Sequence, residues 1–237
     1  GRKGMIVNVT ADSFAIAALK PELANFIAAL PAGAGPSAEG WGFAPGPQSE
    51  GLTFPGQVNY VAKGANLKAL GFEPTGGTAV AIKHLNTTYL WDKVRVQGGA
   101  YGGSSGLDPF AGTSYRDPNL VDTIDVYDKA STFLKDGVGE QDLVRSVIGV
   151  IGSVDTYRLP DAKGFTSLVW ELSGDSEEAR QKRRDEILGA SNRDFKALAE
   201  ALDQVARQGQ VVVLGSETAI KAANDERGGF LKVTKVL

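Results

Sequence analysis

The spacing of apolar residues in the first part of the chain predicts a strand, a helix and a second strand. Met5–Thr10 is a short run rich in β-branched side chains, which favours a strand. Phe14–Leu30 is mostly apolar and follows Asp12 and Ser13, residue types that commonly cap a helix. Apolar and polar residues alternate within Leu52–Ala62, so this segment is expected to form another strand.

The middle of the chain predicts one long helix over Thr78–Val96. Residues suited to a core recur with helical spacing on two sides of it: Val80, His84, Trp91 and Val94 on one, and Ile82, Leu85, Tyr89 and Val96 on the other. A helix with two apolar sides is usually packed between other elements of a core. A third strand is expected at Phe110–Tyr115.

Helices dominate the pattern in the second half of the chain. Asp117 and Pro118 open a helix whose expected buried stripe is Leu120, Ile124, Tyr127 and Leu134. Further helices are expected around Leu143–Ile151, from about Ser176, after the capping pair Ser191 and Asp194, and from Ser216. Two more strands are expected at Gln210–Leu214 and Phe230–Val236. Separated strands and long consecutive helices predict an α+β fold, with helices packed on one face of a mainly antiparallel sheet.

Residues 1–237 are expected to form a single domain that contains one Gly/Pro-rich loop. A chain of 237 residues, 42% hydrophobic and 22% charged, is long enough for one large globular domain. Pro31–Gly51 consists largely of Gly, Pro, Ala and Ser. Such a segment cannot bury enough apolar surface to offset the entropy of ordering, so a flexible loop is expected there. The chain starts at Gly1 without an initiator methionine, which suggests a piece of a longer protein.

Composition argues against several classes of partner and chemistry. A net charge of −3 produces no field that would attract nucleic acid or an anionic membrane. No apolar run approaches the roughly 20 residues needed to cross a bilayer. The chain has no cysteine, and His84 is its only histidine, so neither a zinc site nor a Ser-His-Asp triad made by this chain alone is expected. We interpret His84 as a core residue and assign no metal ligand to this chain.

Two charged clusters are interpreted as solvated surface. Asp122, Asp125 and Asp128 lie opposite the apolar stripe of their predicted helix. The basic run Arg180–Arg184 is flanked by acidic residues, and Glu178 precedes Lys182 by four positions. That arrangement predicts a salt-bridged surface helix and argues against a nucleic-acid-binding stripe.

The most informative segment is Leu90–Ser104, which ends a predicted helix in a group of glycines. Tyr101 lies six positions after Arg95 and is surrounded by Gly98, Gly99, Gly102 and Gly103. The glycines are compatible with a simple helix C-terminus at positive φ. They are equally compatible with close approach of a bound chain, to which Arg95 and Tyr101 would donate hydrogen bonds. A nucleotide site is disfavoured, because the segment follows a helix and no Gly-Lys-Ser/Thr ends it.

Five segments, in this order, resemble the presequence proteases of plant and algal organelles, which belong to the pitrilysin/insulinase class of zinc metallopeptidases. They are Gln57–Lys63, His84 with Leu90–Val96, Gly98–Gly103, Ser114–Leu120 and Leu159–Gly164. The resemblance runs from the first predicted strand to the last residues, and it corresponds to the C-terminal, fourth α/β domain of such enzymes. Pro31–Gly51 is the part that departs from the family pattern.

The resemblance implies that this chain is half of a two-part active site. Enzymes of this class enclose a chamber between two halves, and the N-terminal half supplies an H-x-x-E-H zinc site with a distal glutamate. Arg95 and Tyr101 match the Arg and Tyr that reach from this domain toward the substrate carbonyl, which implies catalytic and substrate-binding roles for both. The glycines of the segment, Gly98, Gly99, Gly102 and Gly103, would then shape the turn that directs Tyr101 into the chamber.

The same resemblance implies substrates, partners and location. The full-length protein would be a zinc metalloendopeptidase that degrades cleaved targeting presequences and other short unfolded peptides in the chloroplast stroma, the mitochondrial matrix or both. Its zinc would be bound by the N-terminal half, a monomeric polypeptide would carry both halves, and this chain alone would be inactive. Neither nucleic acid nor a membrane is expected as a partner. The alternative is a non-catalytic scaffold or partner subunit of a processing complex, because homologous domains serve in that way.

Overall fold

The computed structural model describes residues 2–33, 42 and 49–237. Contacts divide the chain into two compact units. The first comprises Gly1–Pro45 and Asp155–Gln181, and the second comprises Gly46–Val154 and Lys182–Leu237. The prediction that residues 1–237 form one domain stays a prediction.

The first unit is built around helices α1 (Ser13–Ala29) and α6 (Pro160–Ser173). α1 begins as expected, because Asp12 accepts a hydrogen bond from the Ala15 amide at 2.8 Å. The predicted strand at Met5–Thr10 is wrong: this segment has no regular structure. β-Branched residues form strands only where a neighbouring strand takes their backbone hydrogen bonds. No strand among the described residues pairs with Met5–Thr10, which contacts α6 through the Asn8 side chain, a donor to the Gly164 carbonyl at 3.3 Å.

The second unit contains a six-stranded sheet in the order β3-β4-β2-β5-β1-β6. The strands are β1 (Glu50–Thr53), β2 (Tyr60–Ala65), β3 (Gly102–Leu107), β4 (Phe110–Tyr115), β5 (Gln210–Gly215) and β6 (Lys232–Lys235). β2 pairs antiparallel with β4 and β5, as β3 does with β4, whereas β1 pairs parallel with β5 and β6. The α+β prediction is confirmed, with antiparallel pairing on one side of a mixed sheet.

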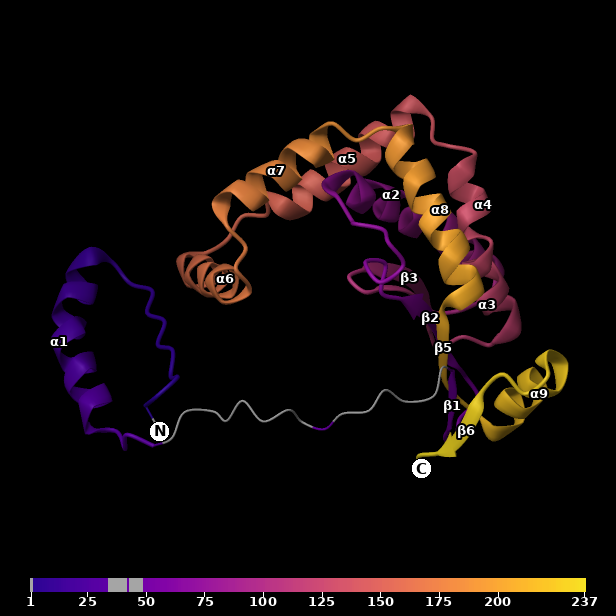
Figure 1. Cartoon of the computed structure of the whole chain (residues 1–237), viewed down its shortest axis with the longest axis horizontal. Helices are drawn as coiled ribbons and strands as arrows, with labels where there is room; N and C mark the ends of the chain where they lie inside the picture. Colours follow the sequence, from indigo (N-terminus) through magenta and orange to yellow (C-terminus); the bar gives the residue numbers. More distant parts are fainter. Residues whose placement is uncertain (1, 34–41, 43–48) are drawn as a thin grey trace. The chain divides into compact units, whose positions relative to one another are not determined.

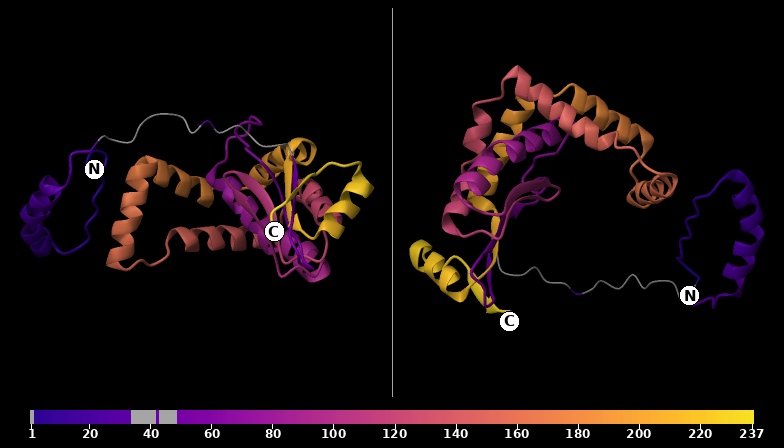
Figure 2. Two further views of the ribbon diagram at one scale, coloured as in Figure 1. Left: turned by 90° about the horizontal axis from the view of Figure 1, so that it is seen from below. Right: turned by 180° about the vertical axis from the view of Figure 1, so that it is seen from behind.

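Helices of the second unit cover one face of this sheet, as Figures 1 and 2 show. They are α2 (Gly76–Thr87), α3 (Val121–Asp128), α8 (Asn192–Gln208) and α9 (Glu217–Arg227), which contact the strands, and α4 (Ala130–Lys135) and α5 (Glu140–Val154), which pack on α8 and α2. Val61 of β2 and Val213 of β5 point toward the helices and are almost completely buried. Residues next to them in the strands point to the other face, where Tyr115 and Val212 are 50% and 41% exposed and no described helix of this unit lies (Figures 1 and 2).

The predicted helix over Thr78–Val96 is instead two helices. α2 ends at residue 87, and a π-helix, η1 (Trp91–Gln97), follows. A π-helical turn contains more residues than an α-helical turn, so a pattern read at 3.6 residues per turn loses phase there. Trp91 and Val96, both expected in the core, are 48% and 63% exposed, whereas Val94 is buried.

The strand boundaries differ from the predictions on both sides of the glycine segment. The predicted strand Leu52–Ala62 is divided into β1 and β2, and Pro55 lies between them, where its missing N–H disturbs no ladder. β3 was not predicted, because Gly102–Leu107 reads GGSSGL and carries no apolar alternation. Glu50 and Gly51, assigned to the Gly/Pro-rich loop, belong to β1. Most of the rest of that predicted loop lies outside the described residues.

Most predicted helices of the second half are confirmed with shifted ends, but one is divided and one was missed. The helix predicted to open at Pro118 and to bury a stripe as far as Leu134 is instead α3, which begins at Val121, followed by α4; the residues of the predicted stripe are nevertheless buried. α7 (Glu177–Leu188) begins in the first unit and ends in the second, and its Lys182 lies 3.8 Å from Glu186. α6 escaped prediction although it has Pro160 in its first turn and left-handed Gly174 at its end.

Candidate functional site

A short turn carries the two predicted site residues from η1 into β3. The amides of Gly98, Gly99 and Ala100 donate to the carbonyls of Lys93, Arg95 and Val94 at 3.0, 3.0 and 3.1 Å. The turn therefore folds back onto the last residues of η1. Its outgoing end is held by the Tyr101 amide, which donates to the Tyr115 carbonyl of β4 at 3.1 Å.

Three of the four predicted glycines have a steric reason for their lack of a side chain. A Cβ at Gly98 would lie 2.6 Å from the Val94 carbonyl oxygen, and one at Gly103 would lie 2.7 Å from the Val94 side chain. Gly99 has φ of +79°. Gly102 has no such neighbour. The turn is made by Gly98 and Gly99, whereas Gly102 and Gly103 belong to β3, which corrects their expected place in the turn.

Arg95 and Tyr101 both present their side chains to solvent at this turn. The Arg95 guanidinium carbon lies 4.1 Å from the centre of the Trp91 ring, one η1 turn earlier. This stacking restrains the side chain without using its hydrogen-bond donors. Tyr101 is 70% exposed, and its ring meets Tyr115 edge to face at a centroid distance of 5.9 Å. The structure thus places a cation and a phenol, each with free donors, at the two ends of one braced turn.

A buried polar network, which the sequence did not reveal, holds the turn through hydrogen bonds. The Asn119 side-chain amide donates to the Gly98 carbonyl at 2.6 Å, and its backbone amide donates to Asp117 Oδ1 at 2.9 Å. Asp117 is fully buried and also accepts from the Thr123 hydroxyl at 2.7 Å. Asn59 of the β1–β2 connection donates to the Asp117 and Asn119 carbonyls, at 3.2 Å each. These residues link three other chain segments, namely the β1–β2 connection, the connection after β4 and α3, to the carbonyl of Gly98.

Three residues of this network belong to two of the five family-like segments, to which the sequence alone assigned no role. Asn59 is part of Gln57–Lys63, and Asp117 and Asn119 are part of Ser114–Leu120. Asn and Asp are common in turns, so their types alone indicated no more than loops. A lone Asp-Pro-Asn tripeptide does not reveal which distant carbonyl it will hold.

The site offers hydrogen-bond donors and positive charge but no acid–base pair. Arg remains protonated at any physiological pH, and the phenol donates one directional hydrogen bond. Such groups bind and polarise a carbonyl or an oxyanion, and they neither generate a nucleophile nor bind a metal cation. In the part of the chain that the structure describes, no three His, Asp or Glu side chains are grouped so that they could hold a metal ion.

His84 is a core residue, as predicted, although its neighbours are not those expected. Its ring stacks on Phe133 and is tilted against Phe195, with centroid distances of 5.6 Å in both cases, whereas Trp91 is exposed. Burial lowers the pKa of His84, and the nearby Asp142 carboxylate opposes that shift. One side of the ring borders a cavity of about 340 Å³ between α2 and α5, lined by Lys83, Thr87, Thr88, Asp142, Arg145 and Ser146.

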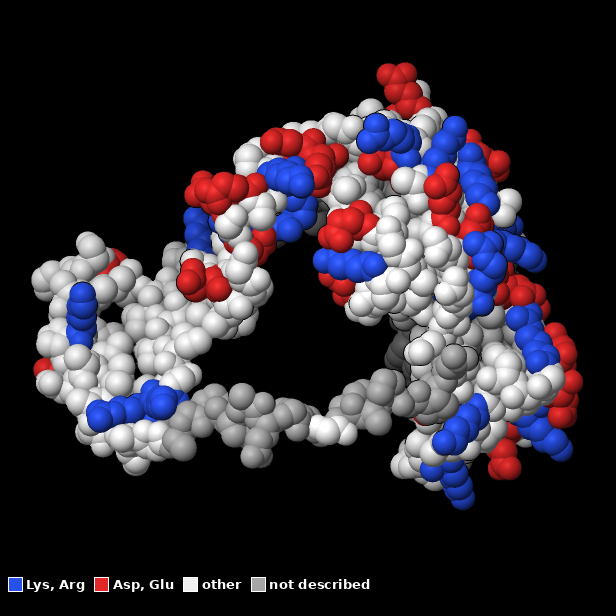
Figure 3. Space-filling model, viewed as in Figure 1, with Lys and Arg blue, Asp and Glu red and all other residues white. Residues whose placement is uncertain are grey.

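Charged residues elsewhere on the second unit form pairs of opposite sign. Figure 3 shows Lys and Arg interspersed with Asp and Glu over the outer surface of the helices. Asp125 and Asp128, predicted to lie on a solvated face, are partly exposed and also form ion pairs: Asp128 lies 2.5 Å from buried Lys63, and Asp125 pairs with Arg227. No helix among the described residues is both long and apolar enough to span a membrane.

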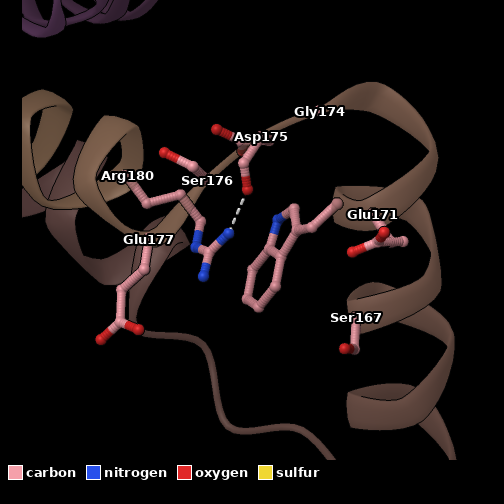
Figure 4. A pocket seen from close by; sticks show the side chains of 8 residues that line it. Ser167, Glu171, Gly174, Asp175, Ser176, Glu177 and Arg180 are labelled. Carbon is pink, nitrogen blue, oxygen red and sulfur yellow. Dashed lines mark hydrogen bonds between the residues drawn. The ribbon is translucent and has the colours of Figure 1, made fainter.

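A second cavity, in the first unit, lies where α6 turns into α7 (Figure 4). Its volume is about 340 Å³, and it is lined by Ser167, Trp170, Glu171, Gly174, Asp175, Ser176, Glu177 and Arg180. The Arg180 guanidinium carbon lies 4.0 Å from the Trp170 ring centre, and the guanidinium donates to the Asp175 carbonyl. Because these contacts occupy the arginine, the cavity is better described as a braced helix junction than as a reactive site.

Comparison with known proteins identifies the family. Residues 49–217 match the family model described as "PreP C-terminal domain". The chain is 43% identical, over its full length, to 22% of Presequence protease 1, chloroplastic/mitochondrial, of Arabidopsis thaliana. It is 35% identical to Protein HypA of Clostridium perfringens, over 83% of this chain and 21% of that protein. The chain thus spans about a fifth of the length of these curated relatives.

The fold is similar to that of a solved peptidase domain. The crystal structure of a peptidase M16 inactive domain from Pseudomonas fluorescens superposes with a TM-score of 0.53 at 16% identity, covering 71% of this chain and 44% of that one. A match at this identity supports the architecture alone, and it agrees with the α+β prediction. The family model and the Arabidopsis relative carry the assignment further, and the chain therefore belongs to the family of presequence protease C-terminal domains.

Proposed function

We propose that this chain is the substrate-binding C-terminal domain of a zinc metalloendopeptidase that degrades cleaved targeting presequences and other short unfolded peptides. Family membership supports this proposal, as does the name of the Arabidopsis relative. The observation that carries it is the pair of solvent-facing donors, Arg95 and Tyr101, on a turn that buried residues brace. Such an arrangement suits recognition of a peptide carbonyl supplied from outside the domain.

In this role Arg95 and Tyr101 act on the carbonyl oxygen of the scissile peptide. Their donors orient the carbonyl in the bound substrate. The hydrogen bonds to the carbonyl oxygen become stronger as negative charge develops on it. The guanidinium contributes full positive charge, and the phenol contributes direction. Gly98 and Gly99 allow the turn that separates the two donors, because a Cβ at Gly98 would meet the Val94 carbonyl and Gly99 has a positive φ.

The described residues contain no set that fits a zinc ion. We therefore assign no metal step to this chain, and we place the zinc, together with the general base, in an N-terminal half of the same polypeptide. A bound zinc supplies Lewis acidity and an activated water. The partners of the chain are then that N-terminal half and unfolded peptides, within a monomeric full-length enzyme. Its location, by analogy with the relative named chloroplastic/mitochondrial, is the chloroplast stroma, the mitochondrial matrix or both.

The first prediction concerns the two donors in the full-length enzyme. Arg95→Ala or Tyr101→Phe should lower kcat/KM for an unfolded peptide by about 10²–10³-fold, the usual effect of removing one oxyanion donor. Zinc content, measured by metal analysis, should remain at the wild-type level, because neither residue is a ligand. Tyr157→Phe, which removes another exposed tyrosine hydroxyl, is the matched control and should leave turnover unchanged.

Two outcomes would count against the proposal. Wild-type turnover in both donor variants would remove Arg95 and Tyr101 from the site. An absence of peptide cleavage by the wild-type full-length protein would favour the alternative, a non-catalytic scaffold.

A further inference from the structure

Four aromatic side chains form a continuous row that begins at Tyr101. Tyr101 precedes β3, Tyr115 ends β4, Tyr60 begins β2 and Phe54 follows β1. Neighbouring ring centroids along the row are 5.9, 5.4 and 6.3 Å apart. β3, β4 and β2 are adjacent in the sheet, so the row crosses the strands. We call these four residues the aromatic row.

The row lies on the face of the sheet that the helices of this unit do not cover. Tyr60 precedes Val61 in β2, and Tyr115 follows Ser114 in β4. Val61 and Ser114 are buried, and their side chains point toward the helices. Successive strand residues point to opposite faces, so both tyrosines point away from the helices. Tyr101 and Tyr115 are 70% and 50% exposed. A contiguous group of exposed aromatic side chains is typical of a surface that binds another molecule.

The hydroxyls of the row are free to bind a partner. Within the part of the chain that the structure describes, Tyr60, Tyr101 and Tyr115 make no side-chain hydrogen bond. The two tyrosines on the helix side of the sheet behave differently: Tyr89 and Tyr127 donate to backbone carbonyls at 2.9 and 3.4 Å. Tyrosines that pair an apolar ring with a free hydroxyl are typical of surfaces that bind another chain.

The shape of the row favours an extended peptide over a folded partner. Beside the row, on the same face, the cross-strand pair of Ser104 and Thr113 presents only small side chains, so the aromatic surface there is one ring wide. In an extended chain, side chains on one side recur every two residues, about 6.4–6.8 Å apart. The rings are spaced at 5.4–6.3 Å, which is close to this repeat.

We propose that the aromatic row binds an extended segment of the substrate peptide and selects apolar side chains at alternate positions on one side of the scissile bond. Tyr101 belongs both to the row and to the carbonyl-binding turn, so the two surfaces are continuous. Phe54, Tyr60 and Tyr115 are then specificity-determining residues, and the tyrosine hydroxyls also reach the polar backbone of the bound peptide. This inference rests on the proposed peptidase function.

The test uses the full-length enzyme and three peptides with a common Ala/Ser/Gly background. The background peptide contains no aromatic residue. The alternate peptide has two Phe residues separated by one position, and the adjacent peptide has two neighbouring Phe residues, on the same side of the cleavage site in both. A second set places the Phe residues on the other side of the cleavage site. The alternate peptide should be preferred over the background peptide by about tenfold in kcat/KM, mainly through KM, which is the scale of a good aromatic contact. The adjacent peptide should gain less, because only one of its two rings faces the row.

Tyr115→Ala should abolish the preference for the alternate peptide, and Tyr60→Ala provides a second, independent variant. The control Tyr157→Ala truncates a tyrosine outside the row that is 80% exposed, and it should retain both the preference and the wild-type rates. Circular dichroism and thermal unfolding establish that each variant is folded. If Tyr60→Ala and Tyr115→Ala slow all three peptides equally, the row supports the fold or an interface between the two halves, and the proposal is overturned.

The inference fails separately from the proposed function. A wild-type enzyme that cleaves all three peptides at similar kcat/KM on both sides of the bond is a peptidase without an alternating preference, which overturns only the role of the row. A wild-type enzyme that cleaves none of them overturns both proposals.

Discussion

At the residue scale, the properties of a side chain follow from its neighbours more than from its type. Tyr101 and Tyr127 illustrate this: the first is 70% exposed, whereas burial raises the pKa of the second above its ordinary value. Burial likewise raises the pKa of Tyr89 to about 12. Arg95 and Arg180 are both surface arginines that stack on a tryptophan, but Arg180 also donates to the Asp175 carbonyl, whereas the stacking on Trp91 restrains Arg95 without using its donors.

Stability should depend on pH through His84. Its pKa in the folded state lies below 6.5 because of burial. As pH falls below 6.5, His84 therefore binds a proton more readily in the unfolded chain than in the folded chain. The contribution of His84 to stability is therefore complete above pH 6.5 and is lost as pH falls toward the folded-state pKa. Urea unfolding between pH 5 and 8 should show this decline, at up to about 1.4 kcal/mol per pH unit for one proton.

The comparison variant is His84→Gln, which cannot titrate. It should be less stable overall, since it loses the stacking on Phe133 and Phe195, but its free energy of unfolding should decline less steeply below pH 6.5. Asp142, Arg145 and Lys83 face the same cavity and remain in both proteins. An identical slope in the two proteins would show that His84 is not the titrating group.

At the element scale, sequence patterns succeeded where local chemistry decides the structure. α8 was predicted from its capping pair, and the structure has that capping box at Ser191 and Asp194. β5 was predicted from an apolar run that ends up in the interior of the sheet. η1 was missed because its π-helical turn departs from the 3.6-residue period, and β3 was missed because its sequence has no apolar alternation. β3 is held in part by a tertiary contact, in which the Ser105 amide donates to Asn86 at 2.6 Å. Sequence periodicity contains no sign of such a contact.

The support of the turn by Asn119 yields a prediction at this scale. Asn119→Ala removes the 2.6 Å hydrogen bond to the Gly98 carbonyl and should lower the free energy of unfolding by about 1–2 kcal/mol. Because the turn then loses its anchor, kcat/KM of the full-length enzyme should fall by about tenfold or more. Chemical denaturation and peptide-cleavage kinetics measure the two effects.

Asn192→Ala is the matched control for this variant. Asn192 also joins its side chain to backbone, accepting from the Val138 amide at 2.7 Å and donating to the Val138 carbonyl at 3.1 Å. Its loss should reduce stability to a similar extent and leave kcat/KM unchanged. If both variants lose activity in proportion to stability, Asn119 has only a structural role.

At the scale of the whole molecule, our proposal gives this chain part of an active site and none of its reactive groups. The family was predictable from the sequence because five motifs occur in the expected order. Arg95 and Tyr101 were candidate donors from the glycine segment itself, and the resemblance added their role at a substrate carbonyl. The bracing of the turn by Asn59, Asp117 and Asn119 was not predictable, since it joins segments up to 60 residues apart. The aromatic row was hidden for the same reason: its rings meet only when the strands pair.

The central claim is that this chain completes an active site whose zinc lies in another part of the polypeptide. The most direct measurement mixes the purified chain with the separately purified N-terminal remainder and follows cleavage of an unfolded, presequence-like peptide. Each part alone should be inactive, and the mixture should cleave the peptide, whereas a mixture made with Arg95→Ala should restore little activity. Full cleavage by the N-terminal part alone, or equal restoration by the Arg95→Ala chain, would contradict the account.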